Sequence, residues 1–206
     1  MYLLTNIRRA VKWIVFEGPD CTGKSTIILE LSKILERSGY RVLVTAEPSR
    51  SPIGRLIRDW LLREKVDPPH IYALTFTADR YYHYYNIVKR GLEQGLIVLQ
   101  ERYKLSTIVY QSEMGIDEKW IMELNRYVPD PDLTIVLDAD PEIIRERLHR
   151  KSSREIFERD IETLSRIRQK YLDIATRLGL PVVRTDRDVR DVVWEVYTIV
   201  RRVLES

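Results

Sequence analysis

The chain has 206 residues, of which 44% are hydrophobic and 32% are charged, and its formal net charge is +3. These values predict one globular domain over residues 1–206, and the small net charge argues against a nucleic-acid partner. The single cysteine, Cys21, excludes an internal disulfide, and no apolar run is long enough to predict a membrane span, so we expect a cytoplasmic protein.

Short apolar runs alternate with amphipathic stretches along the chain. The runs that predict strands are residues 13–16, 41–45, 96–99, 133–137 and 181–183. The stretches that predict helices are 27–35, 53–61, 71–92, 106–111, 118–126, a helix opened by Pro141, a helix ending near 178, and 189–203. Continuous apolar strands separated by helices are typical of a parallel sheet with both faces covered, so the predicted class is α/β.

A glycine-rich segment lies between the first predicted strand and the first predicted helix. It matches G-x-x-x-x-G-K-[ST], and we call it the phosphate loop: Gly18, Pro19, Asp20, Cys21, Thr22, Gly23, Lys24 and Ser25. Backbone N–H groups of such a loop surround nucleotide phosphates at a helix N-terminus. Lys24 is expected to reach the β- and γ-phosphates and Ser25 to bind Mg²⁺. The segment therefore predicts binding of a nucleoside triphosphate.

Charged side chains follow three of the predicted strands. Glu47, the pair Glu101-Arg102, and Asp138 stand where a strand ends. Ligands of an open parallel sheet bind beyond the carboxyl ends of its strands, so we expect these side chains to lie near the phosphate loop. Glu101 is the candidate second magnesium ligand beside Ser25.

One predicted helix carries an aromatic ring and a guanidinium group one turn apart. Phe76 and Arg80 are at positions i and i+4, on one helical face. An aromatic plane suits a nucleobase, and a guanidinium group suits a phosphate. Taken singly, a core aromatic and a surface cation are the commoner interpretations of these two residues. The pair becomes informative when it is combined with the other motifs.

Further motifs extend over most of the chain. The residues that carry them are Phe16-Glu17-Gly18, Asp20, Gly23-Lys24-Ser25-Thr26, Glu47-Pro48, Phe76, Ala78-Asp79-Arg80, Arg102-Tyr103, Ser106, Tyr110-Gln111, Pro131-Asp132-Leu133, Leu137-Asp138, Asp140-Pro141, Phe157-Glu158, Arg168 and Tyr171-Leu172. In this order they resemble the thymidylate kinase family of nucleoside monophosphate kinases. The resemblance implies a three-layer P-loop kinase fold with a five-stranded parallel sheet and a short lid. It also implies a homodimer that transfers the γ-phosphoryl group of ATP to dTMP.

The resemblance also implies roles for individual residues. Phe76 would stack on the thymine, while Arg80 and Arg102 would hold the dTMP. The other acceptor-site residues would be Asp20, Glu47, Arg50, Ser106, Tyr110 and Gln111. The catalytic residues would be Lys24, Glu101, Arg102, Arg150 and Arg154. ATP would be held by the phosphate loop together with Thr26, and Mg²⁺ by Ser25 and Glu101.

A basic stretch corresponds to the lid of the family, at about residues 147–158. It contains Arg147, Arg150, Lys151 and Arg154. The family carries its catalytic arginine either in the phosphate loop or in the lid. Because the loop holds no arginine here, the resemblance implies that the lid supplies it.

The chain departs from the family pattern at three positions. Ala46 stands where many members have arginine, which leaves Arg50 or Arg55 as the substitute. Glu101 replaces the usual aspartate, and its longer side chain changes the expected metal spacing. Phe157 replaces a tyrosine found in some members, which removes one possible hydroxyl contact.

Two other functions fit part of the pattern. A deoxynucleoside kinase also pairs Glu-Pro after the second strand with Glu-Arg after the third, and it would use Glu47 as general base. The second function is that of a nucleotide-binding switch, which hydrolyses its nucleotide without transferring phosphate to an acceptor. Asp20 and the Ala78-Asp79-Arg80 motif favour the monophosphate kinase over the deoxynucleoside kinase. The switch gives no reason for Phe76 and Arg80 beside Arg102 and Gln111.

Overall fold

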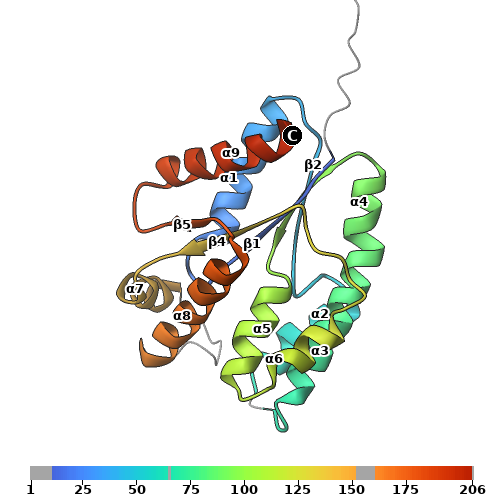
Figure 1. Ribbon diagram of the computed structural model, residues 1–206, viewed down its shortest axis with the longest axis vertical. Helices are drawn as coiled ribbons and strands as arrows, with labels where there is room; N and C mark the ends of the chain where they lie inside the picture. The colour runs from blue at the N-terminus through green and yellow to red at the C-terminus, as the bar shows by residue number, and fades with distance from the viewer. Residues whose placement is uncertain (1–10, 65, 152–160, 206) are drawn as a thin grey trace, which may run out of the picture.

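Five parallel strands form the centre of the molecule, with helices on both sides (Figure 1). The computed structural model describes residues 11–64, 66–151 and 161–205. The strands are β1 (Trp13–Glu17), β2 (Val42–Ala46), β3 (Ile97–Glu101), β4 (Leu133–Asp138) and β5 (Val182–Arg184), in the order β2-β3-β1-β4-β5. Each overlaps a run predicted to be a strand, and every pairing is parallel. The predicted α/β class with a five-stranded parallel sheet is therefore confirmed.

The helices also fall where apolar periodicity predicts them. They are α1 (Lys24–Arg37), α2 (Pro52–Leu56), η1 (Ile57–Leu61), α3 (His70–His83), η2 (Tyr84–Val88), α4 (Lys89–Glu93), α5 (Lys104–Glu113), α6 (Glu118–Leu124), α7 (Pro141–Lys151), α8 (Ile161–Leu178) and α9 (Val189–Glu205). The two η segments are single π-helical turns, so the predicted helix 71–92 is α3, η2 and α4 in succession. None of the helices described is long and apolar enough to cross a lipid bilayer.

The central strand β1 is buried along its whole length. Because side chains alternate along a strand, β1 contributes to the core on both faces of the sheet. Phe16 packs with Ile28 of α1 and Val196 of α9 in one hydrophobic cluster. On the other face, Val15 belongs to a cluster that includes Val88. The last residue of β1, Glu17, shares that second face and leads directly into the phosphate loop.

Candidate active site

The phosphate loop joins β1 to the N-terminus of α1. Gly18 has φ of +135°, and a Cβ atom at this position would lie 2.2 Å from the carbonyl oxygen of Leu137 on β4. Gly23 has φ of +88° and directly precedes the 14-residue helix α1. Both positions therefore need glycine, the first for close backbone approach and the second for a left-handed turn. The loop lies at the helix N-terminus, as the motif requires.

Lys24 and Ser25 extend from the first turn of α1. The Lys24 ammonium donates to the carbonyl oxygens of Gly18 and Pro19, at 3.0 and 2.6 Å, and this side chain is almost fully buried. Ser25 Oγ donates to Glu101 Oε2 at 2.6 Å. The structure therefore brings the two predicted magnesium ligands together, although they are 76 positions apart in the sequence.

Arg102 occupies the centre of the site, immediately after β3. Its φ of +64° lies in the left-handed region, which arginine rarely adopts. Its guanidinium group forms an ion pair with Asp20, donates to Ser106 Oγ at 2.9 Å and lies 5.4 Å from the ring centre of Tyr110. Burial opposes its charge, but the attraction of Asp20 and other groups outweighs burial and raises the pKa of Arg102. This arginine therefore carries a permanent positive charge between the phosphate loop and α5.

Glu47 and Arg80 form a buried ion pair beneath the site. They are 5% and 1% exposed, and the Arg80 Nε and Nη2 atoms lie 3.0 and 2.9 Å from Glu47 Oε2. The other carboxylate oxygen accepts from Gln100 Nε2 at 3.2 Å and lies 3.3 Å from His83 Nδ1. Both oxygens of Glu47 are therefore occupied by the protein itself.

The remaining donors of Arg80 have partners that sequence motifs do not indicate. Nη1 donates to Asn125 Oδ1, and Nη2 donates to the Tyr103 carbonyl oxygen and to Thr107 Oγ1, each at 2.8 Å. Arginine has five N–H donors, so one Nη1 hydrogen has no acceptor among the residues described. Asn125 and Thr107 carry no local signal of this role, since they are 45 and 27 positions from Arg80.

Phe76 and Gln111 lie on neighbouring helices, α3 and α5. Phe76 is partly buried and packs against a cluster that contains Ile57 and Tyr72. Gln111 is 2% exposed, and its side-chain amide has no hydrogen bond to any residue of the described part of the chain. A buried amide without a partner is costly, so Gln111 is suited to a ligand that supplies the missing hydrogen bonds.

Arg50 lies in a loop that is fixed by hydrogen bonds to the Asp79 carboxylate. The Asp79 carboxylate accepts from the Ser49 N–H, the Ser49 hydroxyl and the Ser51 hydroxyl, at 2.6, 2.6 and 2.7 Å. Arg50 itself is exposed and lines a cavity of about 750 Å³ that extends to Ser25 and Glu101. The structure therefore places Arg50 on the same cavity as the candidate metal ligands.

Comparisons with known proteins identify the family. The model of the thymidylate kinase family matches residues 16–196. The chain belongs to the thymidylate kinase family. A probable thymidylate kinase of Pyrobaculum calidifontis is 42% identical, over 94% of this chain and 98% of that protein. One from Sulfolobus acidocaldarius is 40% identical, over 91% and 95% of the two chains. The crystal structure of thymidylate kinase from Ehrlichia chaffeensis has a TM-score of 0.76 at 28% identity, and covers 93% of this chain and 99% of that one.

The resemblance to the thymidylate kinase family, which the sequence motifs indicate, and the predicted P-loop kinase fold are thus confirmed. Two further family motifs meet at the end of β4. Asp138 accepts from Arg168 Nε and Nη2 of α8, at 2.7 and 2.9 Å. Asp140 accepts from the N–H of Glu142 at 3.0 Å, which is the cap predicted for α7.

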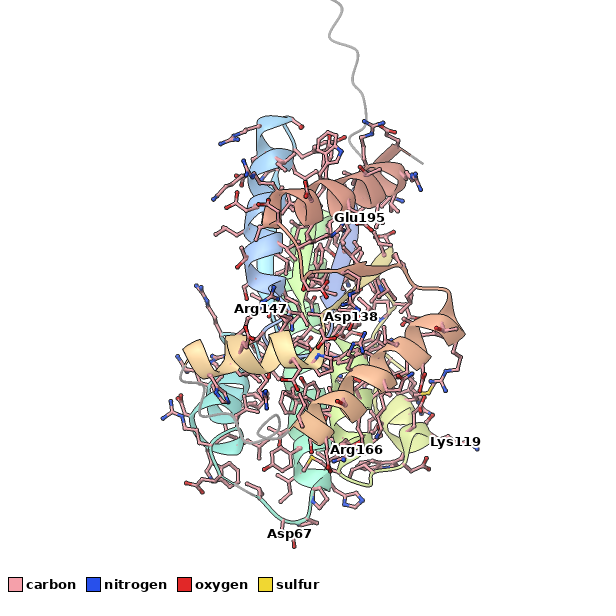
Figure 2. The ribbon with its side chains drawn as sticks, turned by 90° about the vertical axis from the view of Figure 1, so that its left-hand side faces the viewer. Asp67, Lys119, Asp138, Arg147, Arg166 and Glu195 are labelled. Atoms are coloured by element: carbon pink, nitrogen blue, oxygen red, sulfur yellow. The ribbon has the colours of Figure 1, made fainter. Side chains whose placement is uncertain are left out.

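Arg147 is the first basic residue of the segment that the family resemblance predicts as a lid, and it belongs to α7. This side chain, labelled in Figure 2, donates to the carbonyl oxygens of Cys21 and Thr185, at 3.2 and 2.8 Å. With residues of the phosphate loop and α9 it lines a cavity of about 250 Å³. The side chain of Arg150, and the whole of Arg154 and Phe157, lie outside the part of the structure that is described, so their roles stay predictions.

Proposed function

We propose that this member of the family transfers the γ-phosphoryl group of ATP to dTMP, giving ADP and dTDP. The observation that carries the proposal is the position of Arg102, which bridges Asp20 of the phosphate loop and Ser106 of α5. A cation there lies between a donor held by the phosphate loop and an acceptor held by α3 and α5. The relatives named thymidylate kinase support dTMP as that acceptor.

The chemistry needs positive charge rather than a general base. The second pKa of a nucleotide phosphate is about 6, so the attacking oxygen of dTMP is already largely ionised at pH 7. This oxygen forms a bond to the γ-phosphorus while the bond to the β–γ bridging oxygen breaks, and ADP leaves. Lys24 and Arg102 offset the repulsion between the two anionic nucleotides. We propose that Arg150 and Arg154 add further charge from the lid.

Ser25 and Glu101 are suited to hold Mg²⁺. Both offer oxygen ligands, which Mg²⁺ prefers, and their oxygens are 2.6 Å apart. Among the residues described, no cluster of three or more His, Cys, Asp or Glu side chains could form an all-protein metal site. Magnesium in kinases keeps waters and phosphate oxygens as its other ligands, and it would supply neutralisation of phosphate charge.

The acceptor would bind between α3 and α5. Phe76 offers a ring for the thymine, and Tyr110 and the unpartnered amide of Gln111 offer contacts to its polar groups. Arg80 would contribute through its one remaining Nη1 hydrogen. We further propose that Arg50 reaches the acceptor in place of the family arginine absent at Ala46.

The deoxynucleoside kinase is not supported. That enzyme would need Glu47 as general base, but Arg80 and Gln100 already bind its carboxylate, which is 5% exposed. An acceptor hydroxyl could not reach a basic oxygen without breaking this buried ion pair. The nucleotide switch offers no reason for an acceptor side with a buried Gln111 whose amide has no hydrogen bond among the residues described.

A coupled assay tests the function directly. Purified protein with ATP and Mg²⁺ receives dTMP, dUMP, thymidine or no acceptor in parallel reactions. We expect ADP release to depend on dTMP, with dTDP as the second product. Turnover with thymidine but not dTMP, or ADP release without any acceptor, would contradict the proposal.

We also propose that the protein is a cytoplasmic homodimer. A stripe of exposed apolar residues on α3 and η2 contains Leu74, Tyr82 and Tyr85, which are 49%, 43% and 46% exposed. Leu56 and Trp60 of the neighbouring segment add to this surface. Apolar patches of this kind mark protein interfaces. Sedimentation should show a dimer that Leu74→Glu converts to a monomer, and a monomeric wild type would refute this proposal.

A further inference from the structure

The carboxylate of Glu17 caps a helix that lies far from it in the sequence. Glu17 is the last residue of β1 and is completely buried. Its Oε1 atom accepts from the backbone N–H groups of Tyr103 and Ser106, at 2.8 and 3.2 Å. These N–H groups belong to the start of α5, where the N-cap residue Tyr103 makes no side-chain cap of its own. A negative charge at this place also complements the positive end of the helix dipole.

The other oxygen of Glu17 sets the direction of one hydroxyl. Ser106 Oγ donates its single hydrogen to Glu17 Oε2 at 2.6 Å. Its oxygen is then free to accept, and it accepts from Arg102 Nη1 at 2.9 Å. The Tyr171 hydroxyl lies 3.0 Å from the same oxygen. Because a serine has one hydrogen to donate, the bond to Glu17 directs that hydrogen away from Arg102 and leaves the Ser106 lone pairs for the guanidinium group.

We propose that Glu17 is a positioning residue for Arg102, acting through the Ser106 hydroxyl. The inference rests on the proposed function, in which Arg102 lies between donor and acceptor. With the Ser106 oxygen on one Nη atom and Asp20 on the other, the guanidinium group is held from two sides. The contact with Ser106 depends on Glu17. In the sequence, this residue is marked only as the neighbour of the phosphate loop.

The surroundings of Glu17 argue against a purely structural role. The other residues of β1 are apolar and buried, so the carboxylate of Glu17 has a desolvation cost that its neighbours on the strand do not have. Burial raises the pKa of Glu17, against the hydrogen bond from Ser106 and the charge of Arg102, so the fold keeps an unfavourable group. Such a group is expected where geometry matters more than stability.

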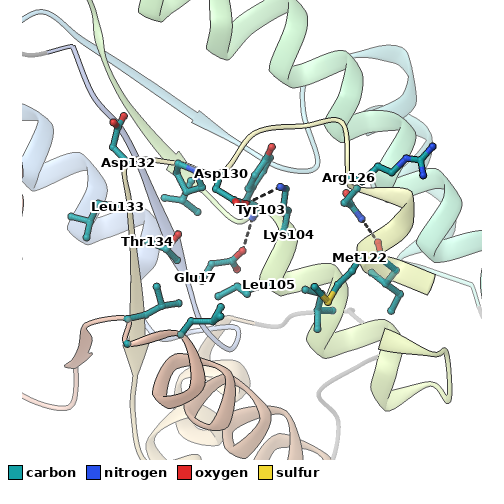
Figure 3. A pocket seen from close by; sticks show the side chains of 18 of the residues that line it. Glu17, Tyr103, Lys104, Leu105, Met122, Arg126, Asp130, Asp132, Leu133 and Thr134 are labelled. Carbon is teal, nitrogen blue, oxygen red and sulfur yellow. Dashed lines mark hydrogen bonds and ion pairs between the residues drawn. The ribbon is translucent and has the colours of Figure 1, made fainter. Parts of the chain in front are cut away.

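Glu17 also forms part of the wall of another cavity, of about 780 Å³, between α5, α6 and the start of β4. Figure 3 shows its carboxylate turned toward Tyr103 and the start of α5. The carboxylate is therefore committed to the helix rather than to the cavity. A variant that keeps the size of this side chain leaves the cavity wall unchanged and tests the hydrogen bonds alone.

Glu17→Gln is that variant. The glutamine oxygen can still accept from the two N–H groups of α5, but its NH₂ group must donate to Ser106 Oγ. This reversal adds a donor to an oxygen that has two lone pairs, and the amide would compete there with Arg102 Nη1 and the Tyr171 hydroxyl, which lie 2.9 and 3.0 Å away. We expect kcat/KM for dTMP to fall about tenfold or more, while the melting temperature and ATP affinity change little. Glu113→Gln, on the outer part of the same helix, serves as the matched control and should leave kcat/KM within about twofold of wild type.

A double-mutant cycle with Ser106→Ala tests the route. If Glu17 acts through Ser106, the double variant loses no more kcat/KM than Ser106→Ala alone, within about twofold. Multiplying losses, or a Glu17→Gln enzyme as active as wild type, would overturn the inference. Should Glu17→Gln fail to fold, Ser106→Ala must still lower kcat/KM for dTMP, and an unchanged value would refute the role.

A structural readout separates this inference from the proposed function. In a crystal structure of the Glu17→Gln variant, Arg102 Nη1 should lie beyond 3.5 Å from Ser106 Oγ, whereas wild type should keep the contact. An unchanged contact in the variant would refute the positioning role. Absence of dTMP turnover in wild type would instead refute the proposed function and leave this comparison valid.

Discussion

Replacing Arg80 by alanine should destabilise the protein as well as lower its kcat/KM for dTMP. Arg80→Ala removes a guanidinium group that is 1% exposed and leaves Glu47, 5% exposed, without its ion-pair partner. Breaking a buried ion pair from one side costs about 3–5 kcal/mol, because a desolvated charge remains. For a chain of this size, that corresponds to a fall in melting temperature of about 6–20 °C. Loss of the hydrogen bonds to Asn125 and Thr107 acts in the same direction.

A second variant separates the charge from the contact with the acceptor. Arg80→Met combined with Glu47→Gln removes both charges of the pair, so it should melt above Arg80→Ala. Both variants lack the remaining Nη1 hydrogen, so both should lose kcat/KM for dTMP by more than about tenfold while ATP binds nearly as before.

Denaturant unfolding, thermal melts and steady-state kinetics on the two proteins provide the test. An Arg80→Ala protein within about 1 kcal/mol of wild type would refute the energetic argument. A stable double variant with wild-type kcat/KM would remove Arg80 from the acceptor site. The two outcomes are independent, since one measures the ion pair and the other measures the acceptor.

Three further predictions follow from single contacts. Lys24→Ala should lower kcat by about 100-fold or more in the coupled assay, and full activity would contradict the role of the phosphate loop. Gly18→Ala should lower the free energy of unfolding by about 2 kcal/mol or more, because its Cβ would lie 2.2 Å from the Leu137 carbonyl oxygen at a φ of +135°; a wild-type denaturation midpoint would refute it. Burial raises the pKa of Glu113, but hydrogen bonds from Arg166 and Lys170 outweigh it and hold the pKa below the ordinary value of 4.5. Glu113 therefore stabilises the native state at pH values above 4.5, and this stabilisation is lost as the pH falls. Glu113→Gln should flatten the acid side of a plot of melting temperature against pH. An unchanged plot would contradict this prediction.

The fold was predictable because its elements depend on local patterns. Apolar runs such as Ile135–Leu137, which is fully buried in the parallel sheet, can be recognised from the sequence without knowledge of the neighbouring strands. The phosphate loop was equally predictable, since its glycines, lysine and serine lie at fixed spacing in one short segment between a strand and a helix. The meeting of Ser25 with Glu101 followed from one topological rule, that parallel strands present their carboxyl ends at the same edge.

The buried hydrogen bonds of Arg80 and Glu17, which lie beneath the site, could not be predicted in the same way. The contacts from Arg80 to Glu47 and Asn125 cross 33 and 45 positions, and no periodicity encodes them. A sequence motif marks Arg80 and Glu47 without showing that they bind each other. Glu17 likewise appears in the sequence only as the residue before the phosphate loop, although it caps a helix 86 positions away.

Three unfavourable local features lie around one guanidinium group. Arg102 has a left-handed backbone conformation that costs an L-residue roughly 1–2 kcal/mol. Cys21, with φ of +57°, has the same kind of strain in the phosphate loop beside Asp20, and Glu17 is a fully buried carboxylate. Glycine would relieve the strain at the two left-handed positions, and the buried carboxylate carries a desolvation cost of its own. Since all three bear on Arg102 or its partner Asp20, the stability lost here is best explained by the need to hold one positive charge in a fixed place.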